Sequence, residues 1–265
     1  MTSQTTDLPQ LLAGKRLLVT GVLTEASIAF ATARMAQQLG AEIVLTGFGK
    51  GIRLTTRVAE RLPSTPDVLE MDVTDIEQMG AVVAELGDRW GAVDGVVHAI
   101  GFAPASAIGG NFLETPWEDV ATAVQVSTYS FASLARVMAP LLKAGGGGSY
   151  VGLDFDATVA WPSYDWMGVA KAGLESACRY TARELGAQGT RVNLVAAGPL
   201  KTMAARQIEG FKSFEDTWGE RAPLGWDITD TEPVARVVCS LLGDWMPGVT
   251  GEIVHCDGGV HAIGA

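Results

Sequence analysis

Arg16-Leu-Leu-Val-Thr20 and Glu42-Ile-Val-Leu-Thr46 are two short apolar runs, and between them lies a segment of helical period over residues 27–39. Both runs have the composition of strands that are buried on two faces. Gly40 follows the helical segment, and glycine is common just after the last turn of a helix. Because parallel strands need a crossover between them, usually a helix, this stretch predicts an α/β fold with a parallel sheet.

The same alternation continues along the rest of the chain. Crossovers between parallel strands are almost always right-handed, so we expect a Rossmann-type, doubly wound parallel sheet of about seven strands with helices on both faces. No repeat or linker divides residues 1–265, which we interpret as a single domain. The further strands are expected at 67–70, 95–98, 149–153, 191–196 and 252–256, and the further helices at 75–90, 117–126, 129–142, 164–185 and 231–242.

Composition narrows the possible functions. Hydrophobic residues make up 48% of the 265 residues and charged residues 18%, which is typical of a chain with a large core. The formal net charge of −11 repels phosphate backbones, so no nucleic-acid partner is expected. The three cysteines and three histidines lack metal-ligand spacing, and no metal is predicted. Without a basic leader or an apolar run of about 20 residues, we expect a cytoplasmic protein that does not enter the membrane.

Residues that could hold a nucleotide follow the first four predicted strands, at the edge where doubly wound sheets bind ligands. Gly21 permits a sharp turn, and the helix that begins near Ser27 and Ile28 offers free N–H groups to a pyrophosphate. Each feature alone could be an ordinary turn or cap, but four in succession favour nucleotide binding. The other predicted contacts are Phe48, Asp72, Val73, Ile100 and Gly101.

Tyr164 and Lys171 are seven residues apart in a segment of helical period. Seven residues make about two helical turns, or about 10.5 Å along the axis, so both side chains can reach one cleft. A tyrosine hydroxyl can hydrogen-bond a forming oxyanion, and a lysine ammonium can hold a ribose hydroxyl. Taken alone, such a pair is more often a packed aromatic residue and a solvated lysine.

Further segments make the chain similar to a known family. They are Leu45-Thr-Gly-Phe48, Asp154-Phe155-Asp156, Ala197-Gly198-Pro199-Leu200-Lys-Thr202 and Asp257-Gly258-Gly259. With the motifs above, they make residues 14–259 resemble the NADH-dependent enoyl-acyl-carrier-protein reductases of type II fatty-acid synthesis. These enzymes belong to the short-chain dehydrogenase/reductase superfamily, and the InhA-type branch is the most similar.

The resemblance implies hydride transfer from NADH to the double bond of a trans-2-enoyl thioester, carried by acyl-carrier protein or CoA. Tyr164 would hydrogen-bond the thioester oxygen, Lys171 would hold the nicotinamide ribose, and Phe155 would lie beside the nicotinamide. A homotetramer is implied as well. The implied contacts to the diphosphate and carboxamide are Gly198, Leu200 and Thr202, and those to the substrate are Phe102, Trp161, Tyr164, Met167 and Met203.

The segment of about 200–226 is, by this resemblance, the substrate-binding loop. It is shorter than the loop of long-chain InhA-type enzymes, so we expect a medium-to-long acyl chain. Whether NADH is strictly preferred over NADPH stays open, because Lys50 and Arg53 lie beyond the immediate turn after the second strand and no acidic residue stands in that turn.

Two other functions compete with this interpretation. Carbonyl-acting relatives carry Tyr-x3-Lys after a strand serine, whereas Gly168 stands at that lysine position and Gly152-Leu153 ends the strand. The second alternative is a non-catalytic NAD(H)-sensing protein. Retention of Tyr164 and Lys171 argues against it, because a sensor needs neither group in that arrangement.

Overall fold

The computed structural model describes residues 10–205 and 210–264, which form a seven-stranded parallel sheet of order β3-β2-β1-β4-β5-β6-β7. This confirms the predicted doubly wound α/β fold. The elements are β1 (Arg16–Val19), α1 (Ile28–Gln38), β2 (Glu42–Gly47), α2 (Ile52–Ala59), β3 (Val68–Glu70), α3 (Ile76–Trp90), β4 (Gly95–His98), α4 (Trp117–Val124), α5 (Ser130–Ala144), β5 (Ser149–Asp154), α6 (Asp165–Gly186), β6 (Arg191–Ala197), α7 (Phe211–Arg221), α8 (Glu232–Leu242) and β7 (Ile253–Cys256).

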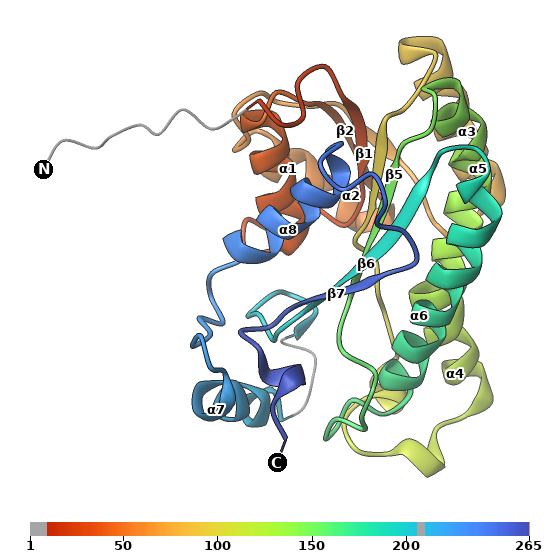
Figure 1. Cartoon of the computed structure of the whole chain (residues 1–265). Helices are drawn as coiled ribbons and strands as arrows, with labels where there is room; N and C mark the ends of the chain where they lie inside the picture. The colour runs from red at the N-terminus through yellow and green to blue at the C-terminus, as the bar shows by residue number, and fades with distance from the viewer. Residues whose placement is uncertain (1–9, 206–209, 265) are drawn as a thin grey trace, which may run out of the picture.

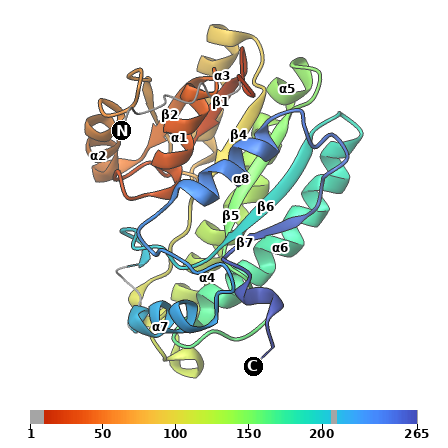
Figure 2. The ribbon, with the colours of Figure 1, turned by 60° about the vertical axis from the view of Figure 1, so that its left-hand side comes forward.

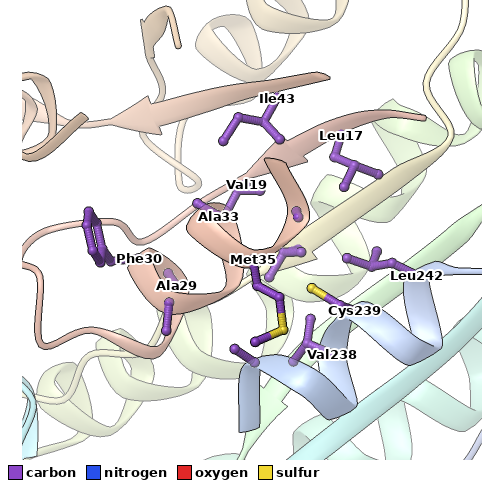
Figure 3. Packing of buried hydrophobic residues seen from close by; sticks show 14 of the residues in the cluster. Leu17, Val19, Ala29, Phe30, Ala33, Met35, Ile43, Val238, Cys239 and Leu242 are labelled. Carbon is purple, nitrogen blue, oxygen red and sulfur yellow. The ribbon is translucent and has the colours of Figure 1, made fainter. Parts of the chain in front are cut away.

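Helices cover both faces of the sheet (Figure 1). One face packs against α1 and α8, and the other against α3, α5 and α6, as the turned view also shows (Figure 2). Met35 of α1 and Cys239 of α8 meet over the first face, where both are buried (Figure 3). The helix α7 lies apart from these two layers, beside the C-terminal end of the chain (Figure 1).

Capping residues in the sequence set two helix starts at the pocket edge of the sheet. Ser27 accepts a hydrogen bond from the backbone N–H of Phe30 and begins α1. Asp75 accepts from two backbone N–H groups of the first turn of α3. Gly91, with φ of 69°, ends α3 in the left-handed conformation that glycine adopts at low cost. Local hydrogen bonding therefore accounts for these boundaries.

The expectation of two separate helices over 117–126 and 129–142 was wrong. A π-helical segment, Gln125–Tyr129, joins α4 directly to α5. No glycine or proline interrupts these residues, so the chain has no local reason to leave the helix. The buried Ser127 hydroxyl instead bonds both the N–H and the carbonyl of Phe102, and π-bulges are frequent at functional sites.

Two helices were not predicted, α2 and α7. The second lies inside the segment 200–226 that was expected to be a loop, although residues 206–209 of that segment are outside the described ranges. Phe211, Phe214 and Trp218 recur at helical spacing, and this pattern could have revealed it. Among the residues that the structure describes, no helix is long and apolar enough to cross a membrane.

Candidate active site

A pocket of about 930 Å³ runs along the carboxyl ends of β1 to β6. Its position is the one that doubly wound sheets use for ligands. Residues that follow six different strands line it, although they are far apart in sequence. All the predicted cofactor and catalytic residues are in its wall, namely Gly21, Ser27, Ile28, Phe48, Asp72, Val73, Ile100, Gly101, Phe155, Tyr164, Lys171, Gly198, Leu200 and Thr202, and so are Phe102, Met167 and Met203.

Two backbone loops meet closely at the base of this pocket. Gly21 has φ of 79°, and a Cβ atom built on it would lie 2.0 Å from the carbonyl oxygen of Ala99. The hydroxyl of Thr20 donates to the carbonyl of Val97 and accepts from the N–H of Ala99, each at 3.0 Å. The chain after β1 thus lies directly against the chain after β4, and only glycine fits at position 21.

The first turn of α1 opens on the same space, because Ser27, Ile28 and Ala29 line the pocket. No acidic residue occupies that turn. The unpaired N–H groups and the positive end of the helix dipole suit a pyrophosphate. Phe48, of which 57% is exposed, lines the wall after β2, and Asp72 lines it after β3. An extended dinucleotide therefore fits this half of the pocket.

Gly198 also lines the pocket, but a packing constraint explains why it is glycine. A Cβ atom at this position would lie 2.7 Å from the ring of Trp226 and 2.8 Å from the ring nitrogen of Trp218. Both indoles are fixed, since Trp226 donates to the Pro199 carbonyl and Trp218 donates to the Asp257 carbonyl. The small residue at position 198 leaves room for both rings against the chain that follows β6.

Tyr164 and Lys171 both line the pocket, and both are buried. Tyr164 is the residue just before α6, and Lys171 lies two turns into that helix. The Lys171 ammonium donates to the carbonyl of Leu153 at 2.8 Å. Burial raises the pKa of Tyr164 far above its usual value, so its hydroxyl keeps a proton to donate. Burial lowers the pKa of Lys171, and the carboxylate of Asp154 opposes this shift.

An unusual turn fixes the position of Tyr164. Its neighbours Ser163 and Asp165 have φ of 57° and 44°, values that are uncommon for residues other than glycine. The Ser163 carbonyl accepts from the N–H of Gly109, and the Asp165 carboxylate accepts from the N–H groups of Gly110 and Asn111. Backbone strain held by such contacts is frequent at functional sites.

Large aromatic side chains form the other half of the pocket. Phe155 lies 5.1 Å from Tyr164 and 5.6 Å from Phe214, measured between ring centroids. Phe214 comes from α7 and is almost fully buried. Trp161 does not line the pocket; it packs behind Phe155 at 5.6 Å and donates to the carbonyl of Asp156. This chamber suits an apolar chain beside Tyr164.

Several pocket residues were not predicted from the sequence. Phe211 and Phe214 enter from α7, and Thr122, Gln125 and Val126 enter from the helix and π-segment that precede α5. The sequence marks the first two only as an apolar group and gives no signal for the other three. No cluster of histidine, cysteine or acidic residues within 10–205 and 210–264 could hold a metal ion.

Comparison with known proteins gives consistent matches over nearly the whole chain. Residues 21–261 match the family model described as enoyl-(acyl carrier protein) reductase. The chain is 48% identical to the enoyl-[acyl-carrier-protein] reductase [NADH] of Mycolicibacterium smegmatis, over 94% of this chain and 97% of that protein. It is 44% identical to the enzyme of that name from Mycobacterium avium, with the same shares. With the enoyl-[acyl-carrier-protein] reductase [NADH] FabI of Neisseria meningitidis the identity is 37%, over 94% and 95% of the two chains.

Proposed function

The chain belongs to the enoyl-(acyl carrier protein) reductase family, and from this premise we propose that it reduces the double bond of an enoyl thioester with NADH, in type II fatty-acid synthesis. One observation carries the proposal. Tyr164 and Lys171 stand where a pocket half that fits a dinucleotide meets an apolar chamber. The relatives are named for NADH and for an acyl-carrier-protein substrate, which supports both assignments.

The residues of the chain have distinct tasks in this reaction. NADH, when bound, supplies the hydride. The Tyr164 hydroxyl donates a hydrogen bond to the thioester oxygen, where negative charge develops. The Lys171 ammonium holds the nicotinamide ribose, and the Leu153 carbonyl fixes the direction of that ammonium. Phe155 and Phe214 exclude water from the apolar chamber, which strengthens the hydrogen bond from Tyr164.

We assign the rest of the wall by position. Gly21, Ser27, Ile28, Gly198, Leu200 and Thr202 bind the diphosphate and carboxamide side, and Phe48, Asp72, Val73, Ile100 and Gly101 bind the adenosine side and the floor. Phe102, Met167 and Met203 contact the acyl thioester. Trp161 acts on the chamber through Phe155, and the segment 200–226, which contains α7, is the substrate-binding segment of a single domain.

A homotetramer in the cytoplasm is part of the proposal. Trp117 begins α4 and Tyr129 ends the π-helical segment, and both side chains are exposed and suit contact with another copy. Closed symmetry makes a dimer of dimers a common arrangement.

The test follows NADH oxidation with trans-2-enoyl thioesters of increasing chain length and a β-ketoacyl thioester as the comparison substrate. We expect turnover of the enoyl series alone. In Tyr164→Phe, kcat should fall by about 10²- to 10⁴-fold with NADH affinity retained. The matched control is Tyr180→Phe, an exposed tyrosine of the same helix, which should behave as wild type.

Two results would contradict the proposal. Turnover of the ketoacyl thioester without enoyl turnover would assign the protein to the carbonyl-acting reductases. NADH binding without turnover of any thioester would favour a sensing role.

A further inference from the structure

Asp154, the last residue of β5, is a buried acid with no described hydrogen-bond partner. Its side chain is 0% exposed, and neither carboxylate oxygen has a hydrogen-bond partner among residues 10–205 and 210–264. A buried carboxylate without partners is costly, and such a group persists only where something offsets the cost. Asp154 also lines the pocket, so the cost falls at the site itself.

The nearest opposite charge is the ammonium of Lys171. Its Nζ atom lies 3.9 Å from Oδ1 of Asp154, beyond hydrogen-bond reach but close enough for a strong charge interaction at a buried site. The same ammonium donates to the Leu153 carbonyl at 2.8 Å. The two residues reach this point from different elements, β5 and α6.

Other titratable groups surround the pair, but each of them is either neutral or paired with a group other than Lys171. His98 on β4 is neutral, because burial lowers its pKa to about 3. Burial raises the pKa of Cys178 on α6 to about 12 and raises that of Tyr164 further, so both are neutral. The remaining neighbours are the carboxylates of Glu175 on α6, which accepts from Ala157 and faces Arg179, and Asp156 after β5, which accepts from Thr158 and faces His255.

We propose that Asp154 is a positioning residue for cofactor binding, whose carboxylate keeps the Lys171 ammonium charged and in place at the pocket. The inference rests on the proposed role of Lys171 in holding the nicotinamide ribose. Asp154 itself touches neither the substrate nor the reacting atoms. Burial lowers the pKa of Lys171, and the charge of Asp154 counters this shift. Burial also raises the pKa of Asp154 to about 7, and the charge of Lys171 counters that shift in turn, so the carboxylate is charged over the alkaline range in which Lys171 titrates. Without it, Lys171 loses its proton at a lower pH.

The test measures the Kd of NADH by fluorescence over roughly pH 6 to 10. Wild-type affinity should fall at the alkaline end, where Lys171 deprotonates. In Asp154→Asn, which keeps the shape but removes the charge, the midpoint of this fall should move about one to three pH units lower. The KM for NADH should rise more than kcat falls, because the defect is in binding.

Three variants complete the design. Asp156→Asn removes the neighbouring carboxylate and should keep the wild-type midpoint. Lys171→Arg carries a guanidinium that stays charged over this pH range. Its affinity for NADH should therefore not depend on whether Asp154 is present. Combining Asp154→Asn with Lys171→Arg should therefore add no shift. Any loss of NADH affinity at alkaline pH that remains in Lys171→Arg comes from the deprotonation of other cations of the pocket, such as Lys50.

An unchanged midpoint in Asp154→Asn, or an equal shift in Asp156→Asn, would overturn the inference. If Asp154→Asn does not fold, Asp154→Glu and Asp154→Ser carry the test, since the first keeps the charge and should hold the midpoint while the second should lower it. The binding assay uses no thioester, so failure of enoyl turnover contradicts the proposed function without deciding this result.

Discussion

The two halves of the pocket differ in the parts of the residues that form their walls. The loops that follow β1 to β4 line the dinucleotide half, and the backbone of Gly21 there lies against Ala99. Aromatic side chains line the other half, where Phe155 and Tyr164 meet Phe214 from α7. The first half therefore depends on the absence of a Cβ atom, and the second on the presence of large rings.

The largest expected effect tests the backbone half. Gly21→Ala places a Cβ atom 2.0 Å from the Ala99 carbonyl, and neither backbone can move without disturbing the β1–β4 pairing. We expect the free energy of unfolding to fall by more than about 4 kcal/mol and NADH binding to be lost, measured by urea denaturation and fluorescence. Gly49→Ala is the control: it also has positive φ but meets no atom within 4 Å, so it should cost about 1–2 kcal/mol.

Removing a ring should damage the aromatic half alone. Phe214→Ala empties a nearly fully buried position and should lower the free energy of unfolding by about 3–4 kcal/mol. The KM for the enoyl thioester should rise while the Kd of NADH stays within about threefold. Phe214→Leu keeps most of the volume and should cost less than about 1.5 kcal/mol. Equal losses of NADH and thioester affinity would contradict the division into halves.

A pH measurement tests what the buried His98, the last residue of β4, contributes to stability. The Ser130 hydroxyl donates to the Val126 carbonyl, so His98 donates to Ser130 through Nε2. Burial lowers the pKa of His98 from 6.5 to about 3. Below pH 6.5 the ring takes up a proton in the unfolded protein but not in the folded one. The free energy of unfolding is therefore highest above this pH and falls as the pH decreases. We expect a loss of about 2 kcal/mol by about pH 5.

The variant that isolates this contribution is His98→Gln. It has no ionisable ring, so its free energy of unfolding should fall less than that of wild type between pH 6.5, the unfolded-state pKa of histidine, and the lowest pH measured. Parallel acid profiles for wild type and variant would show that other groups cause the loss.

The smallest expected effect concerns the cap of α1. Ser27→Ala removes the oxygen that accepts from the Phe30 N–H and should cost about 1 kcal/mol in thermal or urea unfolding. NADH affinity should weaken slightly, because the first turn of the helix loses its fixed geometry. Ser27→Thr should restore most of the stability. A large loss of NADH affinity in Ser27→Thr would indicate that the serine binds the cofactor through its own hydroxyl.

Much of the backbone half was predictable because its signals are local. A strand, a glycine and a capping residue lie within a few positions of one another, as Gly21 and Ser27 do after β1. The aromatic half was only partly predictable. Phe155 and Tyr164 stood out by resemblance, but Phe214 lies about sixty residues further along, in a helix that was expected to be a loop. No periodicity within one segment shows which distant segment it meets.

The sequence by itself determined the alternation of strands and helices, the edge of the sheet that holds the pocket, and the turn and cap residues such as Gly21 and Ser27 in its wall. These follow from hydrophobic period, caps and glycines, which act over a few residues. Tertiary structure alone decided three contacts. The ring of Trp161 packs against Phe155, Ser127 of the π-helical segment hydrogen-bonds the backbone of Phe102, and Asp154 is buried 3.9 Å from the ammonium of Lys171. Burial and pairing are properties of the packed molecule, because the groups that desolvate or compensate a side chain come from remote parts of the chain.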